Sequence, residues 1–216
     1  MSGQLTYQQF VVQAEEFFQI SKMVGEEWQL IEQLDSCRQQ VKYLRKLCYK
    51  TLTMTDHENL EEEHMLSNEN LAIDDSCVDD NECTTNTNDA SSLIICEYNI
   101  IYSTSFSVPV LYFYARHQDG QSLSYDEISE VFSSHHRDCM RNNIWTTVTQ
   151  VEHPIFQNPI FMLHPCKTAS MMLQVNSAEN SLTSKTGNSC YIIQWLSSVG
   201  PAVGLDLSCD YLEHVK

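Results

Sequence analysis

The chain has 216 residues, of which 42% are hydrophobic, and this length predicts one domain with a single sizeable core. Its formal net charge is −17, and no part of the sequence has the basic face or stripe that is normal for nucleic-acid-binding proteins, so we expect protein partners instead. The first residues do not form a secretory signal peptide, and no segment approaches the roughly 20 apolar residues that a membrane-spanning helix needs.

Nine cysteines are spread along the chain. An odd number in a chain of this size is not typical of a secreted disulfide scaffold, so we expect a reducing, cytoplasmic location. Six of these cysteines stand in mostly apolar surroundings, where the expected role is that of a small buried hydrophobic residue. These six are Cys37, Cys48, Cys96, Cys139, Cys190 and Cys209.

The first predicted element is an amphipathic helix from Thr6 to about Val24. Thr6 and Gln9 form a capping-box pattern at its start, and Gly25 is a natural stop. The apolar stripe of this helix is expected to pack on the core. An alternative is that its outer face also docks a partner protein.

Two strands are predicted after this helix, over residues 28–34 and 41–49, with a polar turn between them. Apolar and polar side chains alternate along the second strand, which is typical of a half-exposed antiparallel strand. We expect it to carry a basic outer edge that is either solvated or faces an acidic partner. This edge consists of Lys42, Arg45, Lys46 and Lys50.

Residues 51–92 form an acidic stretch with 12 Asp and Glu residues and no Lys or Arg. The rest of the chain has 17 acidic against 12 basic residues, so the acidity is local. The stretch has too little apolar surface to offset the entropy of ordering it, and we predict a flexible insertion between two strands. A zinc site made of Cys77, Cys83, His57 and His64 is only weakly indicated, because the spacing is not a usual zinc pattern.

Order is predicted to return with a long strand over residues 94–106 that buries one face. Residues 110–115 are apolar on both faces, as in a strand inside a covered sheet. Ser124 and Glu127 form a second capping-box pattern, which predicts a short helix. The adjacent pair His135-His136, which Cys139 follows, is expected to lie in a surface turn rather than to bind a metal.

Further strands are predicted over residues 144–151 and 160–163, where β-branched and aromatic side chains are frequent. A loop rich in Ser, Asn and Thr is predicted over residues 175–189. A closing helix over residues 191–199 ends at Gly200-Pro201. This order predicts an α+β fold, with an antiparallel sheet of four or more strands and flanking helices.

The stretch 161–168 carries the most distinctive chemistry of the chain. A short apolar run leads to His164-Pro165, the proline ends strand pairing, and Cys166 follows with Lys167 beside it. A cysteine attacks as its thiolate, which a neighbouring histidine and lysine could favour. We therefore predict that Cys166 is catalytic, and we predict no metal and no cofactor.

Two chemistries are open for Cys166. A cysteine hydrolase needs a histidine base and an orienting group, for which His117, His153 or His164 and Asp119 or Glu152 are the candidates. A transferase that carries an acyl group as a thioester needs only an exposed thiol and surfaces that hold the donor and the acceptor. Polar residues are sparse around Cys166, which favours the transferase.

Several motifs, taken together, resemble the family of autophagy-related protein ten over most of residues 94–207. The N-terminal third resembles this family mainly through its helix, Trp28 and the basic strand. The family is similar to ubiquitin-conjugating enzymes, so the resemblance implies their fold. The motifs are Pro109-Val110-Leu111-Tyr112-Phe113, Asp119-Gly120, Trp145, Thr147-Val148-Thr149-Gln150, Glu152-His153-Pro154-Ile155, Leu163-His164-Pro165-Cys166-Lys167-Thr168, Trp195-Leu196-Ser197-Ser198-Val199-Gly200-Pro201 and Val203-Gly204-Leu205.

The resemblance implies a conjugating transferase of autophagy. Cys166 would accept the ubiquitin-like autophagy-related protein twelve as a thioester from the activating enzyme, autophagy-related protein seven. It would pass this modifier to a lysine of autophagy-related protein five. The first helix and the strand around Lys42 to Lys50 would lie where such enzymes meet their activating enzyme. The alternative is a non-catalytic module of the same fold that only binds ubiquitin-like proteins.

The chain departs from ordinary ubiquitin-conjugating enzymes at one motif. Those enzymes have a His-Pro-Asn sequence upstream of the cysteine, and its asparagine is linked to stabilising the oxyanion. Here His153-Pro154 is followed by Ile155, and His164-Pro165 by Cys166 itself. The oxyanion donor must therefore come from elsewhere, and by residue type alone the candidates are Asn158, Gln150 and Tyr112.

Overall fold

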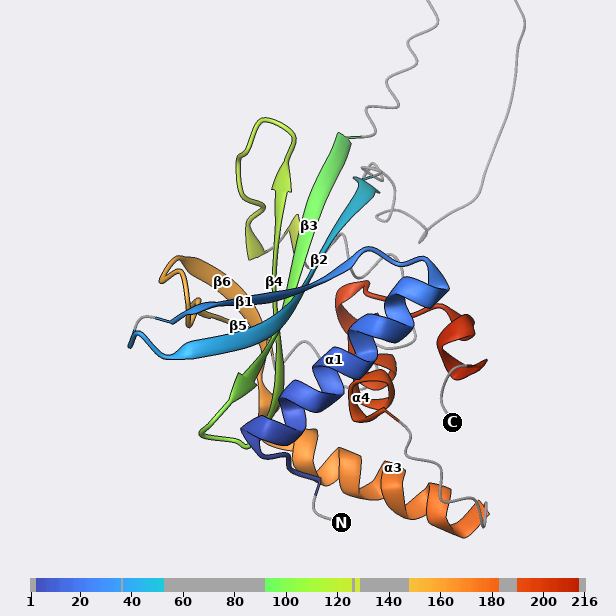
Figure 1. Ribbon diagram of the computed structural model, residues 1–216. Helices are drawn as coiled ribbons and strands as arrows, with labels where there is room; N and C mark the ends of the chain where they lie inside the picture. The colour runs from blue at the N-terminus through green and yellow to red at the C-terminus, as the bar shows by residue number, and fades with distance from the viewer. Residues whose placement is uncertain are drawn as a thin grey trace, which may run out of the picture.

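The computed structural model describes residues 3–35, 37–52, 92–125, 127–128, 148–182 and 190–213. These residues form one antiparallel sheet of six strands, with helices packed on one face of it (Figure 1). The predicted α+β fold, an antiparallel sheet of four or more strands with flanking helices, is confirmed. No helix of the described part is long and apolar enough to cross a membrane.

The strands lie in the order β1-β2-β3-β4-β6-β5. Their bounds are Trp28–Leu34 for β1, Gln40–Leu52 for β2, Ser92–Ser103 for β3, Val108–His117 for β4, Val148–Glu152 for β5 and Pro159–Leu163 for β6. The β5–β6 hairpin joins the sheet through the pairs Tyr112 with Met162 and Phe113 with Phe161. This register brings the end of β6 beside the beginning of β4.

Helix α1 (Tyr7–Val24) begins at the predicted capping box. The Gln9 amide donates to the Thr6 hydroxyl at 3.2 Å, and the Thr6 amide donates to the Gln9 side-chain oxygen at 2.8 Å. The helix ends at Gly25, whose φ of 82° suits a residue without a Cβ. Its buried stripe, which includes Phe10 and Phe17, packs on the sheet, so this prediction is confirmed.

Helix α4 (Tyr191–Val199) covers the same face of the sheet, as predicted for the end of the chain (Figure 1). Two short 3-10 helices follow it, η4 (Gly200–Val203) and η5 (Cys209–Glu213). The buried Tyr98 hydroxyl of β3 donates to the Val203 carbonyl at 2.7 Å, which ties η4 to the sheet. The C-terminal segment of the chain therefore packs on the sheet and closes the core on that side.

The basic side chains of β2 do not form a free outer edge, so that prediction is wrong. Lys42, Lys46 and Lys50 point to the helix side of the sheet, because they share the parity of the buried Leu44. Lys42 pairs with Glu15 of α1 at 2.8 Å, and Lys46 pairs with Glu26 at 2.7 Å. Lys50 donates to the Gly204 carbonyl. Arg45 lies on the opposite face and pairs with Glu97 at 2.6 Å.

Strand β3 is covered on both faces, whereas the alternation predicted one buried face. Its helix-facing side chains are buried as predicted, but Glu97, Asn99 and Ile101 on the other face are also at most 5% exposed. The β5–β6 turn causes this difference, because its Ile155 packs on Ile101 from the outer side of the sheet. A polar side chain on a strand therefore does not by itself indicate a solvent face.

Helix α3 (Thr168–Leu182) extends into the predicted loop 175–189, so residues 175–182 of that prediction are wrong. Ser and Asn have modest helix propensities, but a helix that has begun adds residues easily. The fully buried Met172 anchors its beginning in the core. Tertiary packing of the first turns thus overrides the local composition.

Several predictions fall on residues outside the described ranges. The predicted insertion is one of them, although its ends, Thr51-Leu52 and Ser92, belong to β2 and β3. The residues of the weak zinc alternative, the His135-His136 pair with Cys139, and positions 144–147 also lie outside. The second predicted capping box, formed by Ser124 and Glu127, lies within the described ranges and is present, since the Glu127 amide donates to the Ser124 hydroxyl at 3.3 Å.

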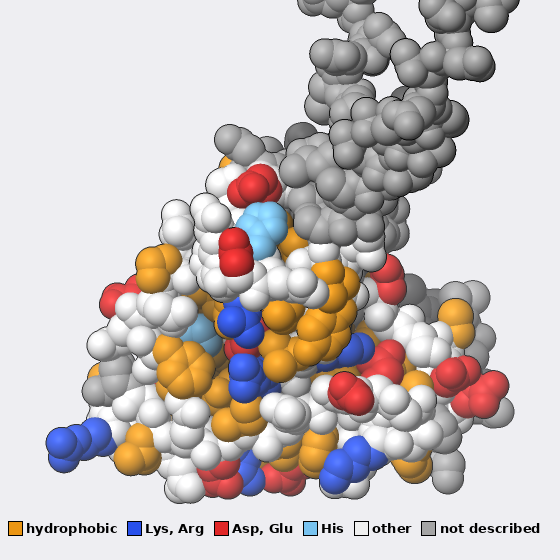
Figure 2. Space-filling model, turned by 90° about the horizontal axis from the view of Figure 1, so that it is seen from above, with side chains coloured by type: hydrophobic (Ala, Val, Ile, Leu, Met, Phe, Trp, Pro, Cys, Tyr) orange, Lys and Arg blue, Asp and Glu red, His pale blue; other side chains and the backbone are white. Residues whose placement is uncertain are grey.

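The described surface mixes charges of both signs. On the face that Figure 2 shows, Lys and Arg side chains lie among Asp and Glu side chains instead of gathering into a stripe. Several of them stand next to large hydrophobic side chains.

Candidate functional site

Cys166 lies on a short turn between a strand and a helix. Strand β6 ends at Leu163, the 3-10 helix η3 (Pro165–Lys167) follows, and α3 begins at Thr168. Cys166 and Lys167 are exposed, whereas Pro165 is buried and anchors the turn. The turn contacts β4, so a rigid sheet supports it from below. An exposed thiol on a supported turn can be reached by a large partner.

His164 organises the backbone of this turn. It is the N-cap residue of η3, and its Nδ1 accepts a hydrogen bond from the Cys166 amide at 3.2 Å. Pro165 follows at the first position, where its missing N–H costs nothing. The Thr168 amide donates to the Pro165 carbonyl and closes the turn. The His-Pro pair therefore sets the backbone conformation that presents Cys166.

The ring of His164 also rests on Phe106, with ring centroids 5.4 Å apart in an edge-to-face arrangement. Phe106 was missed as a site residue, because the alternation placed it inside the predicted strand 94–106. Strand β3 ends at Ser103, and the chain reverses before β4 with Ser107 at a φ of 55°. The run Ser103-Thr104-Ser105 was the available signal for this reversal.

Exposure alone does not single out Cys166 among the described cysteines. Cys37 and Cys209 are also exposed, so the prediction that they are buried is wrong. Cys37 lies in the β1–β2 turn, where its amide donates to Asp35 at 2.9 Å. Cys96 and Cys190 are buried as predicted, and burial raises the pKa of each thiol to about 11. What distinguishes Cys166 is its place between the His-Pro pair and the start of α3.

The candidate bases of a cysteine hydrolase are not arranged around Cys166. His117 lies at the end of β4 opposite to the cysteine turn, about 30 Å along the strand from Val108. Nδ1 of His164 is already an acceptor for the Cys166 amide. Among the described residues, no hydrogen bond joins a histidine to the Cys166 thiol. The described geometry therefore provides no histidine base oriented by Asp119 or Glu152.

His153 has a structural position on the outer face of the sheet. It is 1% exposed, and its Nδ1 accepts the amides of Ile155 and Phe156 at 3.1 and 3.2 Å. These bonds fix the β5–β6 turn that covers β3. Burial lowers the pKa of His153 to about 4, and the negative charge of Glu97 opposes this shift. His153 is therefore neutral at physiological pH.

We expect His153 to make the protein less stable in mild acid. Its pKa is about 6.5 in the unfolded chain and about 4 in the fold, so between these values the unfolded chain binds a proton that the folded protein does not. Wild type should lose about 2 kcal/mol more stability from pH 7 to pH 5 than His153→Gln in urea unfolding. His117→Gln is the matched control, and equal pH dependence in wild type and His153→Gln would contradict the assignment.

The three oxyanion candidates do not converge on the cysteine. Asn158 directly precedes β6, about 16 Å along the chain direction from Leu163 at the other end of the strand. Gln150 is an exposed residue in the middle of β5 and pairs with Phe161. Tyr112 is half-buried opposite Met162, with its ring 6.0 Å from that of His153. None of them is next in space to Cys166 through a described contact.

An open groove of about 410 Å³ lies along the outer side of α1. Side chains from α1, β1 and β2 line it, and the exposed Val12 contributes apolar surface. Glu32 and Lys42 stand on its opposite wall. The groove is remote in sequence from the cysteine turn. Its shape and mixed lining suit a protein segment better than a small ligand.

Comparison with known proteins assigns this arrangement to a family. The model of the family described as "Autophagocytosis associated protein, active-site domain" matches residues 9–210. The match includes α1 from Gln9 onward, all six strands and the Cys166 turn.

Three relatives carry the name ubiquitin-like-conjugating enzyme ATG10. The protein of Homo sapiens is 42% identical over 122 residues, which cover 56% of this chain and 54% of the relative. That of Arabidopsis thaliana is 34% identical over 116 residues, 54% and 52% of the two chains. That of Dictyostelium discoideum is 34% identical over 128 residues, 56% of each. The chain thus spans about half the length of the curated relatives that it matches.

Proposed function

Because the chain belongs to the family of the autophagocytosis associated protein active-site domain, we propose that it is a ubiquitin-like-protein conjugating transferase with Cys166 as its thioester-forming residue. The observation that carries this proposal is the exposed thiol on the capped turn between β6 and α3. The names of the three relatives support the same activity.

The first step is the loading of Cys166. Its thiolate attacks the thioester carbonyl of the modifier's C-terminal glycine on the activating enzyme, a new C–S bond forms, and the enzyme's cysteine leaves as a thiolate. An exposed sulfur is necessary here, because two folded proteins must bring their cysteines together. The sparse polar surroundings suit this exchange, since one thiolate replaces another and no proton has to be moved.

The second step transfers the modifier to a lysine. The lysine amine attacks the Cys166 thioester, an amide bond forms, the C–S bond breaks, the Cys166 thiolate leaves, and the proton that the amine loses passes to this thiolate or to water. A thiolate is a good leaving group, so the chain's main contribution is to hold the acyl group in reach of the amine. By the family resemblance, the modifier is autophagy-related protein twelve, the donor is autophagy-related protein seven, and the acceptor is autophagy-related protein five.

The decisive experiment is a thioester assay. Incubating the full chain with the activating enzyme, ATP and autophagy-related protein twelve should give an adduct that a reducing agent cleaves. A non-catalytic binding module predicts modifier binding without an adduct, and this outcome would replace the proposal. A cysteine protease predicts peptide hydrolysis that depends on one histidine. The described histidines give that reading no support, since none bonds to the Cys166 thiol.

The groove along α1 is the surface that we assign to the activating enzyme. Val12, which lines the groove, is 60% exposed, so its apolar side chain is available for contact with a partner protein. Lys42 and Glu32 on the rim offer charges of both signs for orientation. The groove lies on the helix and strand where the family resemblance puts this contact.

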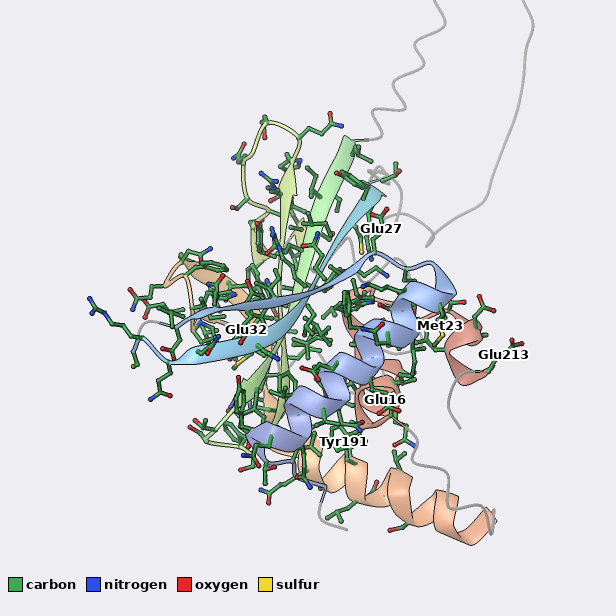
Figure 3. All side chains as sticks on the ribbon, viewed as in Figure 1. Glu16, Met23, Glu27, Glu32, Tyr191 and Glu213 are labelled. Carbon is green, nitrogen blue, oxygen red and sulfur yellow. The ribbon has the colours of Figure 1, made fainter. Side chains whose placement is uncertain are left out.

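We expect Val12→Glu to weaken loading without unfolding the chain. A charge in the apolar part of the groove should raise the half-saturating concentration of activating enzyme by about tenfold, the size of a moderate interface contribution. Initial rates of adduct formation measure this. Met23→Glu is the matched control, because Met23 is equally exposed on the same helix but lies outside the groove (Figure 3). Equal effects of the two substitutions would exclude the groove.

A further inference from the structure

The residues before α1 form a strap, Gly3 to Leu5, that is bound on both sides by buried or half-buried tyrosines. The Tyr191 hydroxyl of α4 donates to the Gly3 carbonyl at 2.8 Å, and this bond is buried. The Tyr102 hydroxyl of β3 donates to the Leu5 carbonyl at 2.7 Å, and the Leu5 amide donates to the Ser107 carbonyl at 2.8 Å. Each end of the strap is therefore held by an element of the core.

The strap touches the chain just after Cys166. Gly3 is buried, and a Cβ at this position would overlap the carbonyl oxygen of Ala169 in the first turn of α3. Only glycine allows this approach of two backbones. Figure 1 shows the N-terminal segment beside the beginning of α3, and Tyr191, labelled in Figure 3, stands between α1 and α3. The strap thus fixes where α3 begins.

The strap also supports the chain just before Cys166. Gln4 donates to the Phe106 carbonyl at 3.4 Å, in the β3–β4 turn to which Leu5 is bound. The Phe106 ring meets the ring of His164, and His164 accepts the Cys166 amide. Contacts from the strap therefore reach the cysteine turn from both of its ends.

We propose that the strap positions the Cys166 turn for acyl transfer, with Gly3 and Tyr191 as positioning residues. The inference rests on the proposed function, since it names what holds the reacting sulfur in place. Pro165 is the one buried residue between His164 and Thr168, and Cys166 and Lys167 are exposed, so contacts at the two ends of the turn help to set its position. Transfer requires a near-attack geometry, and a displacement of about 1 Å can cost about a hundredfold in rate.

Discharge of a preformed Cys166 thioester to free lysine tests the proposal. Tyr191→Phe should lower the rate constant by about fivefold, the factor that corresponds to one lost hydrogen bond. Gly3→Ala should lower it by about tenfold or more, because the backbones must separate. A purely structural role would reduce the fraction of molecules that load but not the rate constant of those that have loaded.

The matched control is Tyr98→Phe. It also removes one hydrogen bond from a buried tyrosine to a backbone carbonyl, that of Val203, which is not part of the strap. Its discharge rate constant should equal that of wild type. Equal rate constants for all variants, or the same loss in Tyr98→Phe and Tyr191→Phe, would overturn the proposal.

A second measurement needs no partner protein. The alkylation rate of Cys166 by iodoacetamide is compared by peptide mass spectrometry with that of Cys37, an exposed cysteine in the remote β1–β2 turn. Tyr191→Phe should change the ratio of Cys166 to Cys37 by up to about fivefold, the factor that corresponds to one lost hydrogen bond, because the turn that presents the sulfur is displaced. An unchanged ratio would overturn the strap inference. If wild type forms no thioester, the proposed function fails and this ratio alone decides the role of the strap.

Discussion

Cys166→Ala is expected to abolish the reducible adduct with the modifier completely. In the proposed reaction the acyl group is bound to this sulfur, and the other described exposed thiols, Cys37 and Cys209, lie on unrelated parts of the fold. Cys166→Ser should give a slowly formed oxyester that resists a reducing agent but is cleaved by alkali, because oxygen replaces sulfur in the same position. Non-reducing and reducing electrophoresis of the same reaction distinguish these outcomes.

Two further substitutions make this prediction specific. Cys37→Ala and Cys209→Ala remove the other exposed thiols of the described residues and should leave the adduct at the level of wild type. An adduct that persists in Cys166→Ala and disappears in either of these variants would move the thioester to another cysteine. An adduct that none of the three changes would place it at a cysteine outside the described ranges.

Arg45→Ala is expected to lower the free energy of unfolding by about 3 kcal/mol. Arg45 donates to Glu97 at 2.6 Å, and the Glu97 side chain is 7% exposed, so its charge remains buried when the guanidinium is lost. Asn99 and Tyr114 also donate to this carboxylate, at 3.1 and 3.2 Å. They satisfy its oxygens but supply no opposite charge. Urea unfolding at pH 7 measures the loss.

The control for this prediction is Lys42, another basic residue of β2. Lys42 pairs with Glu15 at the surface, where the two side chains are 27% and 48% exposed, and Lys42→Ala should lower the free energy of unfolding far less than Arg45→Ala, because solvent screens this pair. The double substitution of Arg45 and Glu97 by leucine should recover part of the stability, because no unpaired charge remains. Equal losses for Arg45→Ala and Lys42→Ala would show that Glu97 is solvated.

Local patterns in the sequence predicted much of the fold correctly. The capping box of Thr6 and Gln9, the stop at Gly25 and the stripe of α1 all depend on residues within a few positions of each other. The strands were recognisable because alternation has a period of two, which the backbone imposes. The loop around Cys166 stood out because a proline ends a strand and presents the next residue.

Local patterns could not predict which side chains are buried on each face of the sheet. Alternation indicates that two sets of side chains point in opposite directions, but it does not say what covers each set. The partners of Lys42 and Lys46 come from α1 and the segment after it, and the cover over Ile101 on the outer face of β3 comes from the β5–β6 turn. Their burial was decided by contacts between segments that are distant in the sequence.

The order of amino acids places a cysteine directly after a His-Pro pair, and the folded protein shows what surrounds that cysteine. Hydrogen-bond caps and strand periods act over a few residues, so Cys166, its turn and its neighbours could be identified from the order of amino acids. The strap from Gly3 to Leu5 meets this turn only because the core brings α4, the β3–β4 turn and the start of α3 together. Packing between distant segments has no short-range signature, and it is this packing that positions the sulfur.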